Sequence, residues 1–307
     1  MESVDFGVQI EPQFGFTYKH ILDIACEAEN LGLESIWISD HFFMTNDSTD
    51  INCLECWTTL TALARDTSKL RLGAMVAAQS YRNPALSANM AASLDHISNG
   101  RLNYGIGAGW KEIEYKAYGY GFPTAVRRIK QLDESLIIAK KMWTQPKATF
   151  SGKYYQVTDA VCAPKPVQKP LPIWVGGMET KTLMVAAKHA NAVNFSWSHP
   201  TDKIEERLNV LKKHCKKIGR DFNEIKKSAG LMVRIVDESE NMKVDHDERY
   251  LGYLGRQNPV MHISSEGLAE TIGDYIDVGV SHFILRFHYY EEQMMLRKFV
   301  KEVLPKI

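Results

Sequence analysis

The sequence predicts an α/β protein in which eight parallel strands close into a (β/α)8 barrel of the TIM type. Short apolar runs rich in β-branched residues alternate with longer amphipathic runs along the whole chain, and each kind occurs eight times. Strands that alternate with helices are typical of a parallel sheet, and the number eight favours a closed barrel over an open, doubly wound sheet. A chain of 307 residues, 45% of them hydrophobic, can bury the core of such a barrel as one domain.

Each element of this alternation has its own sequence signal. The strands are expected at residues 5–10, 34–38, 70–76, 102–107, 172–175, 192–196, 229–236 and 281–285. The helices are expected at residues 17–31, 53–67, 84–98, 125–143, 179–189, 201–218, 264–278 and 289–303. Gly32 and Gly100 stand at the ends of the first and third helices, because glycine adopts the left-handed conformation found there at little cost. Pro84 suits the first turn of the third helix, and Ser264 supplies an N-cap hydroxyl.

Three segments interrupt the alternation and are expected to be insertions in a single domain that spans residues 1–307. They are residues 110–124, 144–171 and 237–263. The second insertion contains an alternating run at 149–157, which indicates a hairpin, and the prolines that follow it exclude a helix. Insertions after a barrel strand usually build the active-site face, so we expect the first and third to shape a substrate pocket.

Composition and charge exclude several classes of function. The 37 basic and 37 acidic side chains balance, whereas a nucleic-acid or anionic membrane surface needs excess positive charge. No apolar run approaches the roughly 20 residues of a membrane helix, and the first residues do not resemble a secretory leader. The number of cysteines, five, is odd, and Cys53 and Cys56 lack the further ligands of a zinc site. We therefore expect a cytoplasmic protein with packing cysteines and no bound metal.

An ordered set of motifs along the chain resembles the bacterial luciferase-like superfamily, and most closely its branch of oxidoreductases that use the deazaflavin coenzyme F420. The motifs are Ser39-Asp40-His41-Phe42, Leu72-Gly73-Ala74-Met75-Val76, Tyr81-Arg82-Asn83-Pro84-Ala85, Ser98-Asn99-Gly100-Arg101-Leu102, Gly105-Ile106-Gly107-Ala108-Gly109-Trp110 and Trp174-Val175-Gly176-Gly177. The resemblance covers nearly the whole chain. It implies a (β/α)8 barrel, often dimeric, that binds a flavin or deazaflavin across its C-terminal mouth.

Asp40 and His41 follow the second strand, where loop residues of a barrel carry its chemistry. An imidazole at this place can deliver or accept a proton while a hydride moves at an adjacent ring, and the resemblance implies this role for His41. Asp40 is expected either to hold the imidazole in one tautomer or to bond the polar edge of the ring, with Ser39 beside it. The alternative is an Asp-His turn that only caps the following loop.

The glycine-rich run at 105–109 resembles a dinucleotide fingerprint, but no acidic residue ends a strand about 20 residues later. A Rossmann site is therefore not expected. The resemblance implies instead that this run contacts the edge of the tricyclic ring; tight strand packing is the alternative. The expected contacts are Gly107, Ala108 and Gly109, with Asn103 and Trp110 nearby.

Two further segments complete the cofactor site that the resemblance implies. Ala74 and Met75 end the third strand, where family members often have a non-prolyl cis peptide that supports the ring, here at Ala74–Met75 or Met75–Val76. Gly176, Gly177 and Met178 open a helix whose exposed amides suit a phosphate, although a plain strand-to-helix turn would look similar. Ser196 and Trp197 follow the sixth strand on the same side and are expected to complete the phosphate site.

The expected function is hydride transfer between F420 and a small organic substrate. An FMN-dependent luciferase-like monooxygenase is the first alternative, and a non-catalytic flavin-binding barrel is the second. Trp110 stands where sugar-phosphate dehydrogenases of this branch carry an acid, which puts a sugar-phosphate substrate in doubt. Residues expected on the substrate side, or else on a solvated rim, are Glu112, Glu114, Tyr115, Arg286, His288 and Tyr289.

The resemblance also implies a homodimer. Apolar side chains on the second and third helices would suit a dimer face, although they would serve barrel packing equally well. These side chains are Leu60, Leu63, Leu86 and Met90.

Overall fold

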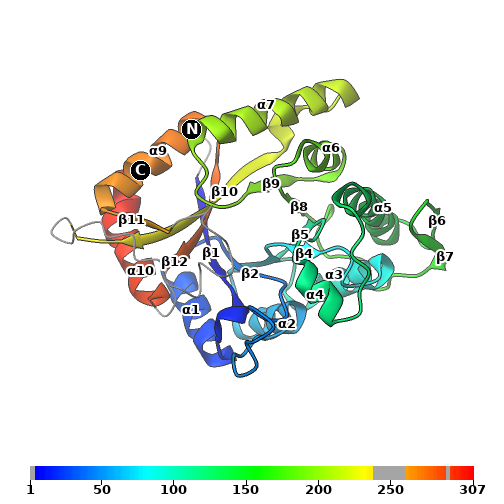
Figure 1. Ribbon diagram of the computed structural model, residues 1–307, viewed down its shortest axis with the longest axis horizontal. Helices are drawn as coiled ribbons and strands as arrows, with labels where there is room; N and C mark the ends of the chain where they lie inside the picture. The colour runs from blue at the N-terminus through cyan, green and yellow to red at the C-terminus, as the bar shows by residue number, and fades with distance from the viewer. Residues whose placement is uncertain (1–3, 238–259, 288–290) are drawn as a thin grey trace.

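The computed structural model describes residues 4–237, 260–287 and 291–307, and within them eight parallel strands close into a barrel (Figure 1). The strands are β1 (Asp5–Ile10), β2 (Ser35–Ile38), β3 (Arg71–Ala74), β5 (Leu102–Gly107), β8 (Ile173–Gly176), β9 (Ala192–Phe195), β10 (Lys226–Ile235) and β12 (His282–Phe287). They pair in this order, and β12 pairs with β1 to close the ring. The predicted (β/α)8 barrel is confirmed.

Helices follow the strands and form the outer layer. They are α1 (Tyr18–Asn30), α2 (Cys56–Asp66), α3 (Pro84–Ile97), α5 (Ala125–Thr144), α6 (Thr180–His189), α7 (Thr201–Ile218), α9 (Ser265–Asp277) and α10 (Glu292–Lys298). The predicted boundary residues hold: Gly32 and Gly100 have positive φ values of 81° and 79°, and Pro84 begins α3. The Ser264 hydroxyl accepts a hydrogen bond from the Gly267 amide at the start of α9. No helix in the described part of the chain has the length and apolarity needed to cross a bilayer.

The insertions differ in how well the sequence describes them. The expected hairpin is present as β6 (Ala148–Ser151) and β7 (Gln156–Ala160), which pair antiparallel on the outer side of α5 (Figure 1). The first insertion contains a helix that the sequence does not predict, α4 (Glu112–Ala117). Most of the third insertion, at 238–259, lies outside the described residues. Its end forms the short strand β11 (Met261–Ile263), beside β10.

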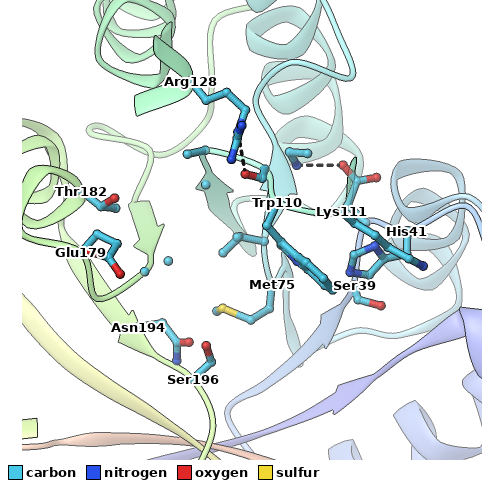
Figure 2. Close-up of a pocket in the computed structure, with 18 of the residues that line it drawn as sticks. Ser39, His41, Met75, Trp110, Lys111, Arg128, Glu179, Thr182, Asn194 and Ser196 are labelled. Atoms are coloured by element: carbon cyan, nitrogen blue, oxygen red, sulfur yellow. Dashed lines mark hydrogen bonds between the residues drawn. The ribbon is translucent and has the colours of Figure 1, made fainter. Parts of the chain in front are cut away.

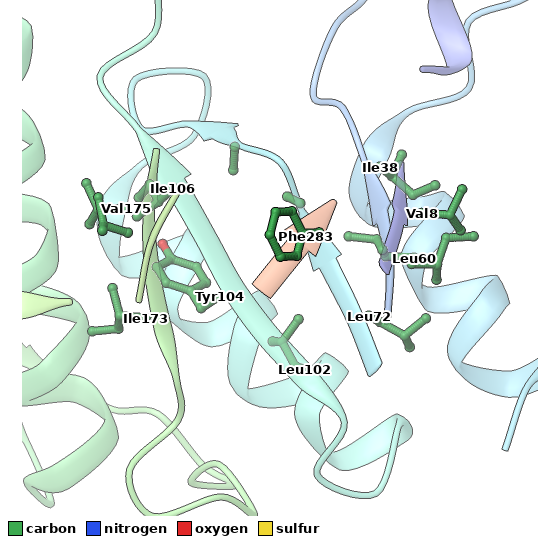
Figure 3. Packing of buried hydrophobic residues seen from close by; sticks show 14 of the residues in the cluster. Val8, Ile38, Leu60, Leu72, Leu102, Tyr104, Ile106, Ile173, Val175 and Phe283 are labelled. Atoms are coloured by element: carbon green, nitrogen blue, oxygen red, sulfur yellow. The ribbon is translucent and has the colours of Figure 1, made fainter. Parts of the chain in front are cut away.

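The core lies between the barrel wall and the helices. Val8, Ile38 and Leu72 on neighbouring strands are fully buried, and Leu60 of α2 packs in the same cluster (Figure 3). Burying a side chain of this size stabilises the fold by about 1.5–3 kcal/mol relative to leaving it in water. This packing fixes the positions of the strand ends that carry the site.

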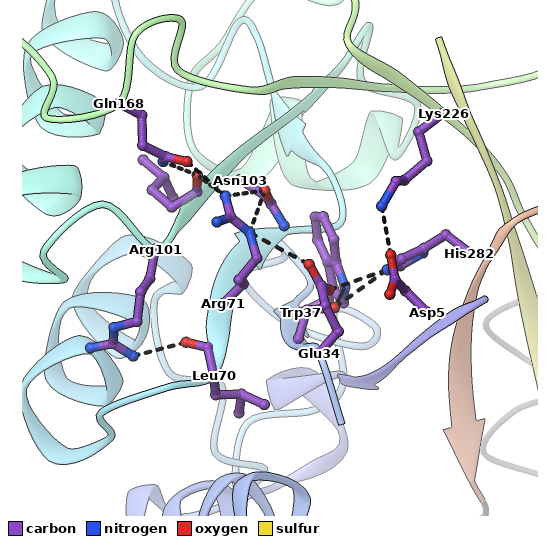
Figure 4. A network of polar contacts seen from close by, with 12 residues as sticks. Asp5, Glu34, Trp37, Leu70, Arg71, Arg101, Asn103, Gln168, Lys226 and His282 are labelled. Carbon is purple, nitrogen blue, oxygen red and sulfur yellow. Dashed lines mark hydrogen bonds and ion pairs between the residues drawn. The ribbon is translucent and has the colours of Figure 1, made fainter. Parts of the chain in front are cut away.

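A polar network ties together the amino-terminal ends of the strands (Figure 4). The Arg71 guanidinium donates to Asn103 Oδ1 from Nη2 at 2.7 Å and lies 3.5 Å from a Glu34 oxygen. The buried His282 imidazole lies 2.9 Å from the Ser228 hydroxyl. Because it belongs to this network, Asn103 lies at the opposite end of the barrel from the mouth. Residues at this end of a barrel serve stability rather than catalysis.

Candidate active site

A cavity of about 350 Å³ opens at the carboxyl ends of the barrel strands (Figure 2). His41 and Trp110 lie on one side of it, and Glu179 and Thr182 of the β8–α6 region lie on the other. Twelve of the fifteen predicted site residues line this cavity: Ser39, Asp40, His41, Met75, Gly107, Ala108, Gly109, Trp110, Gly176, Gly177, Ser196 and Trp197. The barrel thus brings together segments that are far apart in the sequence.

Three predicted site residues do not line the cavity. The prediction for Asn103 is wrong, because its side chain bonds Arg71 at the other end of the barrel. Ala74 is buried in the hydrophobic core, and Met178 packs against that core. Both flank cavity residues in sequence, but their side chains serve packing.

His41 is held by a glutamate of the first insertion. Its Nδ1 atom lies 2.9 Å from Glu114 Oε2, and the imidazole is only 13% exposed. Glu114 is fully buried on α4, in the loop that follows β5. The sequence suggests Glu114 only as a substrate-side or rim residue, and its contact with His41 depends on the tertiary fold.

Glu114 is ionised at neutral pH. Burial raises the pKa of its carboxyl group, but the hydrogen bond from His41 and the charges of His41 and Lys111 outweigh burial and hold this pKa at about 2. Lys111 Nζ donates to Glu114 Oε1 at 3.0 Å. Burial lowers the pKa of Lys111, and the charge of Glu114 opposes that shift.

Asp40 belongs to a different network from its neighbour His41. Its two carboxylate oxygens accept hydrogen bonds from the Arg82 guanidinium at 2.7 and 2.9 Å, and Oδ2 also accepts from the Ala78 amide at 3.1 Å. Arg82 is bonded in turn to Glu55, the N-cap residue of α2. Of the two roles expected of Asp40, that of holding the imidazole is wrong in this structure: Asp40 fixes the loops after β2 and β4 (Ala77–Ala78), and Glu114 lies beside His41. A bond from Asp40 to the polar edge of a ring stays a prediction.

Trp110 forms the lip of the cavity beside His41. Its indole is 56% exposed, and the two ring centroids are 5.6 Å apart in an edge-to-face arrangement. An aromatic ring in this place offers a planar apolar surface next to the imidazole. The sequence places Trp110 in the site correctly.

The glycines of the run at 105–109 have two different functions. A Cβ atom on Gly105 would collide with the Ala74 carbonyl oxygen of β3, so Gly105 is required for strand packing. Gly107 and Gly109 line the cavity, and a Cβ atom on Gly107 would meet the Val76 side chain. The Met75–Val76 peptide bond is cis, at one of the two positions expected. Gly105 therefore has the packing role that the sequence offers as the alternative, whereas the contact of Gly107 and Gly109 with a ring stays a prediction.

The far side of the cavity offers hydrogen-bond donors for an anion. Gly177 has a φ of 132°, a conformation that favours glycine, and α6 begins three residues later. The Thr182 and Ser196 side chains come from α6 and from the segment after β9. Arg128 of α5 also lines the cavity and donates to the Gly109 carbonyl oxygen at 3.1 Å. Backbone amides at a helix N-terminus together with a cation are suited to a phosphate.

Arg128 and Asn194 are cavity residues that the sequence reasoning misses. Arg128 resembles any basic residue of an amphipathic helix, and only the fold turns it toward the mouth. The sequence does contain a signal for Asn194, because this residue is polar and lies within the otherwise apolar strand β9, where it is buried.

The remaining substrate-side candidates separate into distinct environments. Arg286 is buried at the end of β12 and forms an ion pair of 2.7 Å with Glu11, which lines the cavity. Glu112 is exposed and pairs with Lys116. Tyr115 is buried, and its hydroxyl oxygen lies 2.6 Å from the Ser80 hydroxyl oxygen. His288 and Tyr289 lie outside the described residues.

The two cysteines of the C-x-x-C motif are packing residues. The Cys53 thiol donates to the His41 carbonyl oxygen at 3.2 Å, and the Cys56 thiol donates to that of Ile38 at 3.5 Å. Burial raises the pKa of Cys53 to about 12, so its thiol is unreactive at neutral pH. Among the described residues, no group of His, Cys, Asp and Glu side chains has the arrangement of a metal site.

Comparison with known families identifies the family to which the chain belongs. Residues 4–282 match the model of the luciferase-like monooxygenase family. The chain belongs to this family. Among curated proteins, an F420-dependent glucose-6-phosphate dehydrogenase of Amycolatopsis mediterranei is 27% identical over 96% of each protein. Another of that description, from Kineococcus radiotolerans, is 25% identical over 93% of this chain and 92% of that protein.

Several solved structures have the same fold. An F420-dependent secondary alcohol dehydrogenase in complex with an F420–acetone adduct superimposes with a TM-score of 0.86 over 99% of both chains, at 18% identity. The long-chain alkane monooxygenase LadA superimposes with a TM-score of 0.82 at 16% identity, covering 100% of this chain and 91% of that one. At these identities the likeness establishes the barrel and its topology.

Proposed function

We propose that this protein is an F420-dependent oxidoreductase that transfers a hydride between the deazaflavin and a carbon atom of a small organic substrate. The observation that carries the proposal is the His41–Glu114 pair at one end of a glycine-walled cavity whose other end is suited to a phosphate. The descriptions of the full-length relatives support the same cofactor.

The residues present fit this cofactor. Gly107, Gly109 and Gly176 line the cavity beside Met75 and Val76, and because they have no side chains of their own they suit a flat ring that lies close to the backbone. We assign the phosphate to the start of α6, with Arg128, which already donates to the Gly109 and Pro123 carbonyl oxygens, as a cation of the same cavity. When bound, F420 supplies a ring carbon that accepts or donates a hydride.

The protein's part in the reaction is to hold the substrate and to move a proton. Oxidation of an alcohol releases a hydroxyl proton as the hydride leaves carbon, and His41 is placed to accept it. The His41 side chain is 13% exposed, and Trp110 lies edge-to-face beside it. In the reverse direction the protonated imidazole returns the proton to a carbonyl oxygen.

The substrate is proposed to be uncharged. Two cations around the described part of the cavity are already neutralised, Lys111 by Glu114 and Arg286 by Glu11. We therefore do not extend the sugar phosphate of the named relatives to this chain, in agreement with the replacement of an acid by Trp110.

An FMN-dependent monooxygenase is the second candidate, favoured by the family description and by the fold shared with LadA. The same wall of glycines and the same phosphate site would hold FMN. A barrel without catalysis is the less favoured alternative, because such a protein has no need for a buried carboxylate bonded to a histidine at the cavity.

We also propose that the protein is a cytoplasmic homodimer. Its five cysteines are all free thiols. Leu86 and Ile97 of α3 are 54% and 50% exposed beside a surface groove between α2 and α3, whereas Leu60 and Leu63 are fully buried and serve barrel packing. Light scattering of the purified protein should give twice the monomer mass of 34.9 kDa, and substitution of Leu86 and Ile97 by glutamate should reduce it to the monomer mass.

The function is tested by mixing the protein with oxidised F420 and single candidate substrates in the absence of oxygen. We expect loss of the visible absorbance of F420 with small alcohols, and no comparable loss with a sugar phosphate or without protein. The second candidate would be favoured if no alcohol of a broad panel reduced F420 and the protein instead turned over reduced FMN and oxygen.

A further inference from the structure

We propose that Glu114 is a positioning residue that holds the His41 proton on Nδ1 and thereby keeps Nε2 as the proton acceptor for the substrate. The inference deepens the proposed function, on which it rests for the role of His41. It assigns to a residue of the first insertion the task that the sequence suggests for Asp40.

The evidence is that the groups around the Glu114 carboxylate are hydrogen-bond donors. Oε1 accepts from the Phe42 amide at 2.9 Å and from Lys111 Nζ at 3.0 Å. Oε2 accepts from the Tyr81 hydroxyl at 2.7 Å and lies 2.9 Å from His41 Nδ1. An ionised carboxylate can only accept hydrogen bonds, so the proton of this last contact belongs to the imidazole. A neutral His41 is then protonated on Nδ1, and Nε2 has the lone pair.

The other partners keep Glu114 in this state. Burial and the charge of Glu114 raise the pKa of Tyr81, so its hydroxyl remains a donor. The Phe42 amide can only donate, and it belongs to the residue next to His41 in the chain. The carboxylate is thus fixed from two sides, and it fixes the imidazole in turn.

This arrangement predicts an unusual result for Glu114→Gln, which keeps the size of the side chain. The new NH2 group would face hydrogen-bond donors whichever way the amide turns. Tyr81 and His41 lie at one position, and Phe42 and Lys111 lie at the other. The Phe42 amide cannot adapt, whereas His41 can adapt by moving its proton to Nε2 and accepting through Nδ1. We therefore expect the variant to hold His41 in the other neutral tautomer, in which Nε2 can no longer take the substrate proton.

The test is 15N NMR of the imidazole nitrogens in the cofactor-free protein, whose chemical shifts distinguish the two neutral tautomers. Spectra are recorded at about pH 9, above the ordinary titration range of histidine, and the His41 signals are assigned by their absence in His41→Gln. We expect the Nδ1–H form in the wild type and the Nε2–H form in Glu114→Gln. The control is Glu112→Gln on the same helix, whose exposed side chain pairs with Lys116 and should leave the wild-type tautomer.

Activity gives the second readout. Glu114→Gln should lower kcat for F420 reduction by roughly 10²–10⁴-fold with F420 affinity changed less than about threefold, and Glu114→Asp should recover part of the loss. An Nε2–H form in the wild type would overturn the proposal, even if the variant did not fold, and so would the same tautomer in both proteins. The tautomer result does not depend on F420, so failure of the proposed function would appear separately, as the wild-type protein lacking F420 turnover.

Discussion

His41 and Asp40 are neighbours in the sequence, yet their side chains belong to separate networks. The sequence indicates that a histidine after the second strand lies at the barrel mouth, because the (β/α)8 topology fixes where strands end. It does not indicate the partner of that histidine. Glu114 lies 73 residues away and contacts His41 only because the β5–α5 insertion folds back over the loop after β2. Residue positions at the mouth are thus predictable, and side-chain partners are not.

For His41→Ala we expect turnover with F420 to fall by about 10²–10⁴-fold, because a placed proton acceptor contributes on this scale. The cofactor contacts on the glycine wall remain, so the Kd for F420 should change by less than about threefold. Steady-state kinetics and fluorescence titration measure the two quantities. Turnover equal to wild type across the pH range would remove His41 from the proposed mechanism.

For Asp40→Asn we expect a loss of stability. The change removes the buried one of the two carboxylates that pair with the Arg82 guanidinium and leaves only the half-exposed Glu55, and breaking a buried ion pair costs about 3 kcal/mol or more. Urea unfolding of the cofactor-free protein measures the free energy of unfolding. The matched control is Asp23→Asn, which breaks an exposed ion pair with Lys19 and should cost less than about 1 kcal/mol. Equal effects of the two substitutions would contradict the structural role of Asp40.

At the scale of elements, the barrel strands and their helices are predictable because local pattern and tertiary environment agree. The first strand and the strand at 102–107 match the structure at both ends, and Pro84 in the first turn of α3 and the N-cap Ser264 of α9 also match. The helix α4 is not predictable, because its six residues have little intrinsic helical stability. What holds it in place is the burial of Glu114 and Tyr115 against the loops of the mouth, which the local sequence does not encode.

The pairing of β3 with β5 depends on a single glycine. In Gly105→Ala the new methyl group would meet the Ala74 carbonyl oxygen, and the two strands would have to separate. We expect a loss of about 1–3 kcal/mol or more in the free energy of unfolding, measured by urea denaturation. Gly273→Ala in α9 is the control, because a Cβ atom there meets open space and should stabilise the helix by about 0.5–1 kcal/mol. A neutral effect of Gly105→Ala would show that this close approach is absent in solution.

At the scale of the whole molecule, the barrel joins two kinds of site in one cavity. The β2 and β5 ends contribute a histidine with a buried carboxylate partner, and the β8 and β9 ends contribute glycines and donors suited to a phosphate. This combination requires a ligand that is flat at one end and anionic at the other. FMN and F420 both have this form, and they differ in the ring atom that exchanges the hydride and in the acidic tail of F420 beyond its phosphate.

The cofactor is therefore tested most directly by equilibrium titration of the cofactor-free protein with F420 and with FMN under the same conditions. We predict that F420 binds at least about tenfold more tightly, a difference of about 1.4 kcal/mol, and that the protein-bound F420 is reduced by an alcohol substrate. Tighter binding of FMN, with oxidation of its reduced form coupled to oxygenation of a substrate, would contradict the assignment of this protein as an F420-dependent oxidoreductase.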